Sequence, residues 1–301
     1  MSEAHPFDGA IVIAGPTASG KTELAIDLAE RIGAEIIGAD SQQLYADLPI
    51  ATCQPSAGQR ARVPHHLIGV LPSQERMSAA RYGALAREAA KAIAARGKRV
   101  LLVGGTGFYL RAAIEGLYEG PAADVATRAA LEAEAAREGR AHLHARLAQV
   151  DPEAAARLSP NDLRRVIRAL EVYELTGESQ TSHHRRHRRQ VPTVGWFAID
   201  VPRPILYERI QRRTQQIFDG LVAEARALRE GGFTRSPAAR ALGVSEALRF
   251  LGGDLSREDA LALTVQATRR YAKRQLTWFR GVKAMHWLSV GEPVPCPSGI
   301  P

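Results

Sequence analysis

The hydrophobic residues of this chain form two patterns, short continuous runs and longer stretches with helical spacing. Short apolar runs bounded by glycine or polar residues are typical of strands buried inside a parallel sheet. The spaced pattern is typical of helices that pack one face against such a sheet. Strands are expected at 11–14, 34–38, 99–103, 194–199 and 284–288, and long helices at 21–32, 77–96, 204–230 and 256–280.

This alternation of strands and helices predicts an α/β fold, a parallel sheet flanked by helices. Ligands of such sheets bind beyond the carboxyl ends of the strands. Residues 46–75 show neither pattern and are predicted to form a long surface connection, a kind of segment that is often functional or mobile.

The stretch 121–189 differs from the rest of the chain, since it is rich in Ala, Arg and Glu and has no strand pattern. Helix breaks are expected at Gly139, Asp151-Pro152 and Ser159-Pro160. We therefore predict an α/β core made of residues 1–120 and 190–301, interrupted by a mainly helical insertion at 121–189.

The composition favours a polyanionic partner. The 301 residues include 40 Lys and Arg against 32 Asp and Glu, a formal net charge of +8. Nearly all the basic residues are arginine, so a generally arginine-rich proteome is an alternative explanation. No apolar run is long enough for a membrane span, the N-terminus is unlike a signal peptide, and Cys53 and Cys296 lack metal-type spacing. We expect a cytoplasmic protein with no membrane contact.

A P-loop pattern lies between the first predicted strand and the first predicted helix, which is the context that gives this pattern its meaning. Its glycines allow backbone N–H groups to surround phosphate oxygens, and the helix N-terminus adds partial positive charge. Lys21 is predicted to reach the outer phosphate, and the Thr22 hydroxyl to ligate Mg²⁺. The predicted phosphate-binding residues are Gly15, Pro16, Thr17, Ala18, Ser19, Gly20, Lys21 and Thr22.

Two further polar positions are predicted to lie at the same edge of the sheet. Asp40 follows the second strand, and the third strand ends in Gly104-Gly105-Thr106-Gly107. Many P-loop ATPases have an Mg²⁺-ligating Asp at the latter position, so its absence argues against a motor or switch NTPase.

The order of motifs resembles that of the bacterial tRNA dimethylallyltransferases, and the resemblance spans almost the whole chain. The matching segments are Gly-Pro-Thr-Ala-Ser-Gly-Lys-Thr (15–22), Asp-Ser-Gln-Gln-Leu-Tyr (40–45), Val-Pro-His-His-Leu-Ile (63–68), Gly-Gly-Thr-Gly-Phe-Tyr-Leu (104–110), Asp-Pro-Glu-Ala-Ala-Ala-Arg-Leu (151–158), Pro-Asn-Asp-Leu-Arg-Arg-Val-Ile-Arg-Ala-Leu-Glu-Val-Tyr (160–173) and Thr-Arg-Arg-Tyr-Ala-Lys-Arg-Gln-Leu-Thr-Trp-Phe (268–279).

The resemblance implies transfer of a dimethylallyl group from dimethylallyl diphosphate to N6 of adenosine 37 in the tRNA anticodon stem-loop. It also implies a nucleotide-kinase-like P-loop fold, Mg²⁺ as the only cofactor, and a monomer. Asp40 would act as the base that accepts the N6 proton, with Thr106 and Lys21 also catalytic, and Arg213 would face the diphosphate. The implied tRNA-binding residues are Asp40, Ser41, Gln42, Gln43, Thr106, Arg128, Arg164, Arg165, Val166, Ile167, Arg168, Lys273 and Arg274.

The chain departs from the family pattern at two places. Ala51-Thr-Cys-Gln-Pro55 replaces the usual Gly-Thr-Ala-Lys-Pro and so lacks a lysine, and Gly243-Val-Ser-Glu246 replaces a Gly-Tyr motif. These changes put tRNA affinity in doubt more than the reaction class. The basic run 183–189 is either a solvated face or an RNA contact, and His65 and His66 are expected to pack in a loop and not to bind a metal ion.

Three functions are compatible with the motifs. The first is the tRNA prenyltransferase. The second is a P-loop enzyme acting on a free nucleotide, either a kinase or an adenylate prenyltransferase. The third is a non-catalytic RNA-binding protein with a relic phosphate site, against which the intact Lys21 and Thr22 argue.

Overall fold

The computed structural model describes residues 5–118, 120–187 and 195–295 and divides the chain into two compact units. Unit 1 contains Met1–Ile114 and Val191–Pro301, and unit 2 contains Glu115–Gln190. The boundaries predicted from the sequence follow residues 120 and 189. The first lies six residues after the observed junction, and the second lies one residue before it. No helix within the described ranges is long and apolar enough to span a bilayer.

Within the described part of unit 1, six strands form a single sheet in the order β3-β2-β4-β1-β5-β6. Every pair of neighbours is parallel, which confirms the predicted parallel sheet. The strands are β1 (Ile11–Ala14), β2 (Ala34–Gly38), β3 (His65–His66), β4 (Arg99–Gly104), β5 (Gly195–Asp200) and β6 (Met285–Ser289).

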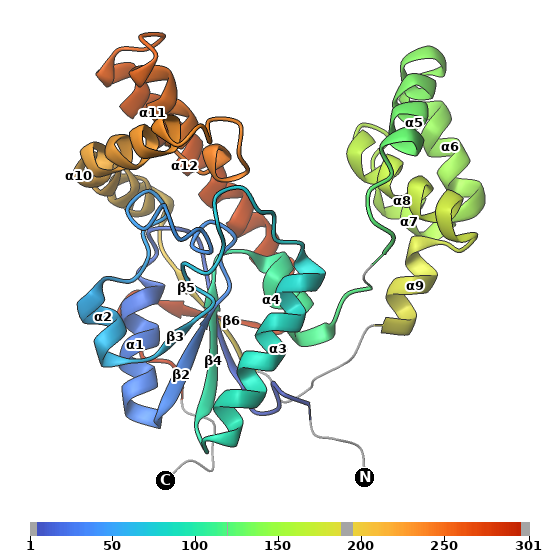
Figure 1. Ribbon diagram of the computed structural model, residues 1–301. Helices are drawn as coiled ribbons and strands as arrows, with labels where there is room; N and C mark the ends of the chain where they lie inside the picture. The colour runs from blue at the N-terminus through green and yellow to red at the C-terminus, as the bar shows by residue number, and fades with distance from the viewer. Residues whose placement is uncertain (1–4, 119, 188–194, 296–301) are drawn as a thin grey trace. The chain divides into compact units, whose positions relative to one another are not determined.

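Helices cover both faces of this sheet, which is why its central strands are apolar at successive positions (Figure 1). Ile11 and Ile13 of β1 pack with α1 (Lys21–Ile32), while Val12 faces the side covered by α3 (Ala79–Ala95). The layers therefore fix the carboxyl end of β1, where the P-loop begins, between neighbouring strands and a helix.

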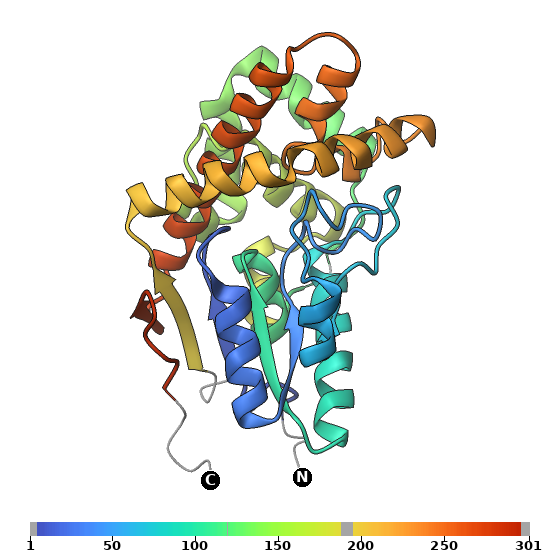
Figure 2. The ribbon, with the colours of Figure 1, turned by 90° about the vertical axis from the view of Figure 1, so that its left-hand side faces the viewer.

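Two long helices of unit 1 come from the C-terminal third of the chain and gather beyond one end of the sheet (Figure 2). They are α10 (Arg203–Glu230) and α12 (Arg257–Arg280), and both match the helices predicted there. Five shorter elements were not predicted. These are α2 (Ala57–Arg62) and β3 within the expected connection, α4 (Gly107–Glu115), the 3-10 helix η1 (Ala238–Arg240) and α11 (Val244–Leu251).

The described elements of unit 2 are all helices, and the unit has a core of its own. The predicted breaks hold, because Gly139 separates the first two helices, Asp151 caps the third, and Gly177 ends the fourth in the left-handed region. The helices are α5 (Val125–Glu138), α6 (Arg140–Val150), α7 (Pro152–Arg157), α8 (Leu163–Thr176) and α9 (Gln180–His187).

Candidate active site

The P-loop connects the buried strand β1 to helix α1, as predicted. Gly20 occupies the N-cap position with φ 95°, a backbone conformation that favours glycine. Because glycine has no side chain to cap the helix, the first amides of α1 are left for another acceptor. Those amides and the positive end of the helix dipole form a site suited to an anion.

Two cationic side chains from distant parts of unit 1 border this loop. Lys21 donates to the backbone oxygen of Pro16 at 3.3 Å, and Arg213 of α10 donates to the Thr17 hydroxyl. Burial lowers the pKa of Lys21, against the opposing attraction of Asp40. The predicted position of Arg213 beside the P-loop is therefore confirmed, and a bound diphosphate would meet both cations.

The Ser19 hydroxyl is buried and has no hydrogen-bond partner among the described residues. Its residue is only 2 % exposed. An unpaired buried hydroxyl is costly unless a ligand satisfies it, and a phosphate oxygen would accept its proton.

Asp40 and Thr106 lie together at the carboxyl edge of the sheet, because they follow the paired strands β2 and β4. The Thr106 hydroxyl accepts a hydrogen bond from the Ser41 amide at 2.9 Å and donates to the Ser41 hydroxyl at 3.3 Å. The backbone amide of Gln42 donates to Oδ1 of Asp40 at 2.9 Å, which orients the carboxylate. The expectation that both side chains share the P-loop edge is confirmed.

Helix α12 contributes two side chains that the sequence did not single out. Tyr271 lies close to Thr106 and Ser41, and the pKa of its hydroxyl is raised by burial and by the nearby Asp40. Gln275, one turn later, contacts the P-loop at Thr17 and the β4 end at Gly105. Their spacing of four residues was visible in the sequence, but nothing there indicated which face of the helix meets the site.

A cavity that is open to solvent lies at this edge and is called here the Asp40 cavity. We call the segments that follow β2 and β4 (40–43 and 104–107) the acceptor edge. Residues of the P-loop, of the acceptor edge and of α12 all contribute to the wall of the cavity. Its lining residues used below are Thr17, Asp40, Gln42, Cys53, Arg213 and Tyr271. A second cavity is lined by Lys21, Thr22 and mainly apolar residues around them.

Thr22 is the residue predicted to ligate Mg²⁺, and it begins α1 beside Lys21. Within the described ranges no three His, Cys, Asp or Glu side chains form a cluster that could hold a metal ion. Mg²⁺ typically keeps several waters and binds through one or two protein oxygens together with substrate phosphates. A single hydroxyl at the P-loop fits an ion that arrives with a diphosphate.

The segment that departs from the family pattern forms part of the Asp40 cavity. Glu224 of α10 accepts hydrogen bonds from the amides of Ile50 and Ala51, at 2.7 and 2.8 Å. Cys53 has φ 52° and lines the cavity, and burial raises the pKa of its thiol. Gln54 stands where a lysine is usual.

The side-chain amide of Gln54 holds the acceptor edge by hydrogen bonds, whereas the usual lysine would supply a positive charge. It donates to the backbone oxygens of Gln43 and Tyr45, at 3.1 and 2.8 Å, and accepts from Arg60 at 2.6 Å. The Gln43 side chain in turn donates to the backbone oxygen of Cys53 at 2.7 Å. Gln54 and Gln43 therefore join residues 43–45 to residues 53–60.

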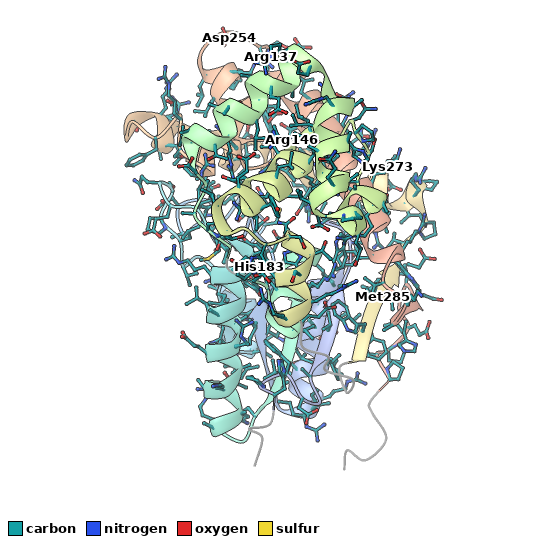
Figure 3. The ribbon with its side chains drawn as sticks, turned by 90° about the vertical axis from the view of Figure 1, so that its right-hand side faces the viewer. Arg137, Arg146, His183, Asp254, Lys273 and Met285 are labelled. Carbon is teal, nitrogen blue, oxygen red and sulfur yellow. The ribbon has the colours of Figure 1, made fainter. Side chains whose placement is uncertain are left out.

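The predicted tRNA contacts of unit 1 fall into two groups. Ser41, Gln42 and Gln43 lie at the acceptor edge, and Gln42 also accepts from the amide of Leu242 at 3.3 Å. Lys273 and Arg274 are exposed on α12, where Lys273 is labelled in Figure 3. The aromatic residues nearby have structural roles, since Phe279 is fully buried and Trp278 packs on Gly107.

The predicted contacts of unit 2 divide by burial. The side chains of Val166 and Ile167 are buried in the core of the unit, because α8 packs one face inward. Of the run 164–168, Arg164 and Arg165 are the exposed side chains, and contact of this run with tRNA stays a prediction.

Arg128 and Arg168 are engaged inside unit 2. Both hydrogen-bond to the buried carboxylate of Glu171, Arg128 at 2.9 and 3.0 Å and Arg168 at 2.6 Å. Similar bracing occurs at Arg146 of α6, labelled in Figure 3, which pairs with Glu134 of α5 and Glu174 of α8. These arginines stabilise the helical unit, whatever else they contact.

The basic run at 183–189 is only partly described, because Arg188 and Arg189 lie outside the described residues. His183 is buried and stacks on Tyr118, with ring centroids 4.0 Å apart. Arg185 and Arg186 pair with Glu153 and Glu178. An RNA contact by this run stays a prediction.

The two histidines expected to pack in a loop instead form the short strand β3, which pairs with β2. His66 of β3 contacts the Glu35 carboxylate at 2.6 Å, and Nδ1 of His65 lies 2.7 Å from the backbone oxygen of Val63.

Comparison with known proteins identifies the family to which this site belongs. The model of the family described as "IPP transferase" matches residues 43–282, and that of "Isopentenyl transferase" matches residues 9–63. The chain belongs to the IPP transferase family.

Relatives in this family are similar over nearly their full length. A tRNA dimethylallyltransferase from Anaeromyxobacter dehalogenans is 47% identical, covering 93% of this chain and 94% of its own. A second, from Streptomyces coelicolor, is 44% identical over 97% of this chain and 93% of its own.

Solved IPP transferase structures share the fold. The tRNA isopentenylpyrophosphate transferase from Bacillus halodurans has a TM-score of 0.69 at 38% identity, covering 93% of this chain and 89% of that one. A eukaryotic dimethylallyltransferase, described as acting on tRNA, has a TM-score of 0.78 at 26% identity, covering 93% and 73%. The expected P-loop fold of this family is thereby confirmed.

Proposed function

We propose that this protein transfers the dimethylallyl group of dimethylallyl diphosphate to N6 of adenosine 37 in tRNA and releases diphosphate. The observation that carries the proposal is the Asp40 cavity, whose wall contains Thr17 of the P-loop, Arg213 and Asp40. A phosphate-binding loop and a carboxylate beside one cavity suit a reaction with a diphosphate leaving group and a proton to remove. The names of the relatives agree with it.

The P-loop would hold the diphosphate of the donor. As the allylic C–O bond breaks, its electron pair passes to the diphosphate oxygen, and negative charge grows there. Lys21, Arg213 and the first amides of α1 are positioned around this loop to stabilise that charge. A planar guanidinium such as Arg213 can contact two phosphate oxygens at once.

Asp40 would act on the acceptor. The N6 lone pair forms the new bond to the allylic carbon, and the nitrogen must then lose a proton, which the Asp40 carboxylate accepts. The amide of Gln42 holds the carboxylate, and Thr106, fixed by Ser41, would hold the nucleotide.

Mg²⁺ is the cofactor we propose. The Thr22 hydroxyl would help to hold the ion, which would supply charge neutralisation on the leaving group.

The macromolecular acceptor is the tRNA anticodon stem-loop. Adenosine 37 must leave the stacked loop for its N6 to reach Asp40. The exposed Arg164 and Arg165 of unit 2, with Lys273 and Arg274 of unit 1, are the side chains we assign to the RNA backbone. We further propose a monomer that works in the cytoplasm, where its RNA substrate is found.

The test is a direct prenyl transfer assay. The protein is incubated with dimethylallyl diphosphate, Mg²⁺ and an anticodon stem-loop bearing adenosine 37, and parallel reactions contain AMP or ATP. Mass spectrometry is expected to show a stem-loop heavier by one prenyl group. Modification of AMP with an unchanged stem-loop would overturn the tRNA assignment in favour of a free-nucleotide prenyltransferase. Phosphoryl transfer from ATP in place of prenylation would indicate a kinase.

A further inference from the structure

Gln275 of α12 connects two loops that are far apart in the sequence. Its Oε1 accepts a hydrogen bond from the amide of Thr17 in the P-loop at 2.9 Å. Its Nε2 donates to the backbone oxygen of Gly105, also at 2.9 Å. Gly105 immediately precedes Thr106, so one side chain contacts both the loop for the leaving group and the loop for the acceptor.

This contact uses both ends of the side-chain amide, because the oxygen accepts one hydrogen bond and the nitrogen donates the other. A side chain without both an acceptor and a donor would lose at least one of the two bonds. The residue is 5 % exposed, and a Cβ at position 105 would lie 2.1 Å from Nε2 of Gln275. Glycine at 105 therefore allows the close approach that the bridge needs.

We propose that Gln275 is a positioning residue that keeps the diphosphate-binding loop in register with the acceptor edge; this rests on the proposed prenyl transfer. Thr17 also receives the hydrogen bond of Arg213, and Thr106 is tied to Ser41 beside Asp40. At one end of the bridge, Thr17 is hydrogen-bonded to Arg213, and at the other end Gly105 is the neighbour of Thr106. Arg213 and Thr106 are both assigned to the reaction. Misplacing reacting groups by about 1 Å can slow a reaction about 100-fold, so a shared anchor has a large effect on rate.

The test uses two substitutions that keep the side chain about the same size. Gln275→Met removes both hydrogen bonds. Gln275→Glu keeps an acceptor for Thr17, but its ionised carboxylate faces the Gly105 oxygen without a proton to donate. Gln266→Met is the matched control, since Gln266 is exposed on the same helix. Measurements are single-turnover prenylation at saturating substrates, the Kd of a non-reactive thiolodiphosphate analogue, and the Kd of the stem-loop.

For Gln275→Met we expect a single-turnover rate constant lower by about 10- to 100-fold, with each Kd changed by less than about threefold. Gln275→Glu gives a second signature. Burial raises the pKa of a carboxyl group, and the protonated form can again donate to Gly105. Its rate relative to the wild type at the same pH is expected to rise about tenfold as pH falls from about 8.5 to 5.5.

A merely structural role would give a different result. Unchanged single-turnover rates in both variants, or a rate ratio for Gln275→Glu that stays flat with pH, would overturn the inference. So would a loss of donor or stem-loop affinity that accounts for the whole effect. A wild-type protein that leaves the stem-loop unmodified overturns the proposed function instead, and the inference falls with it.

Discussion

Asp40 is the residue on which the proposed chemistry depends most directly. One carboxylate oxygen is engaged by the amide of Gln42, which fixes the direction of the group within the Asp40 cavity. Asp40→Asn keeps this hydrogen bond and the size of the side chain but removes the base. We expect its single-turnover prenylation rate to fall by about 10²- to 10⁴-fold, while binding of the thiolodiphosphate analogue is retained.

Asp254→Asn is the matched control for this prediction, because Asp254 is an exposed acid of the same unit. Its rate should equal that of the wild type. Turnover by Asp40→Asn at a near-normal rate would remove Asp40 as the base and leave it as an orienting residue.

Which single residues could be predicted depended on whether a motif marks them in the sequence. Asp40 and Thr106 lie two residues after a strand, and Lys21 ends the P-loop that follows β1. Parallel strands bring their carboxyl ends to one edge, so adjacency was predictable. Tyr271 and Gln275 lie within a long helix, where every face has polar residues and only packing selects the one that meets the site. The contacts of Arg128 and Arg168 inside unit 2 could not be predicted for the same reason. Nothing in the sequence distinguishes their partner Glu171 from an exposed acidic residue of a helix.

At the scale of elements, a buried ion cluster holds unit 2 together. Glu171 of α8 is fully buried and accepts hydrogen bonds from Arg128, Arg168 and the amide of Asp124. Burial acts to raise the pKa of Glu171, but the two arginines and the amide outweigh it, and the pKa is lowered. The cluster therefore ties α8 to α5 and to the residues just before it.

The lowered pKa of Glu171 sets the sign of a pH effect. Its stabilising contribution is complete above the unfolded value of about 4.5 and is lost as pH falls through the lower folded value. Glu171→Gln should lower the local unfolding free energy of α8 by about 3 kcal/mol at neutral pH. The difference from the wild type should shrink below the unfolded pKa. Hydrogen exchange of peptides from 163–176 measures both.

Glu174→Gln is the control on the same helix. Glu174 pairs with Arg146 at a partly exposed position, where an ion pair contributes about 0–1 kcal/mol. Equal protection in the two variants would contradict a special role for the buried cluster.

The elements themselves were predictable where burial is strongest. Strands covered on both faces must be apolar along their length, so β1, β2 and β4 were visible as runs. The short α2, β3 and α11 were missed because one or two turns, or two residues, show too little periodicity to be recognised. Helix α4 was missed because its first residues belong to the glycine-rich motif after β4.

At the scale of the whole molecule, the formal net charge is +8, and each of the two units has exposed arginine or lysine side chains. Binding of a stem-loop through its phosphates releases counterions, so the logarithm of the binding constant falls linearly with the logarithm of salt concentration. We expect the Kd for the stem-loop to rise at least about tenfold between about 50 and 200 mM salt.

The slope of that line assigns individual contacts. Replacing Arg164 and Arg165 together by Ala should reduce its magnitude by about one to two, since each lost phosphate contact removes about 0.7–0.9. Arg99→Ala is the control, because Arg99 is exposed at the start of β4, the opposite edge of the sheet from Thr106. Fluorescence anisotropy over a salt series measures all three proteins. A flat line for the wild type would contradict phosphate binding altogether, while equal slopes for the wild type and the double variant would move the contact away from α8.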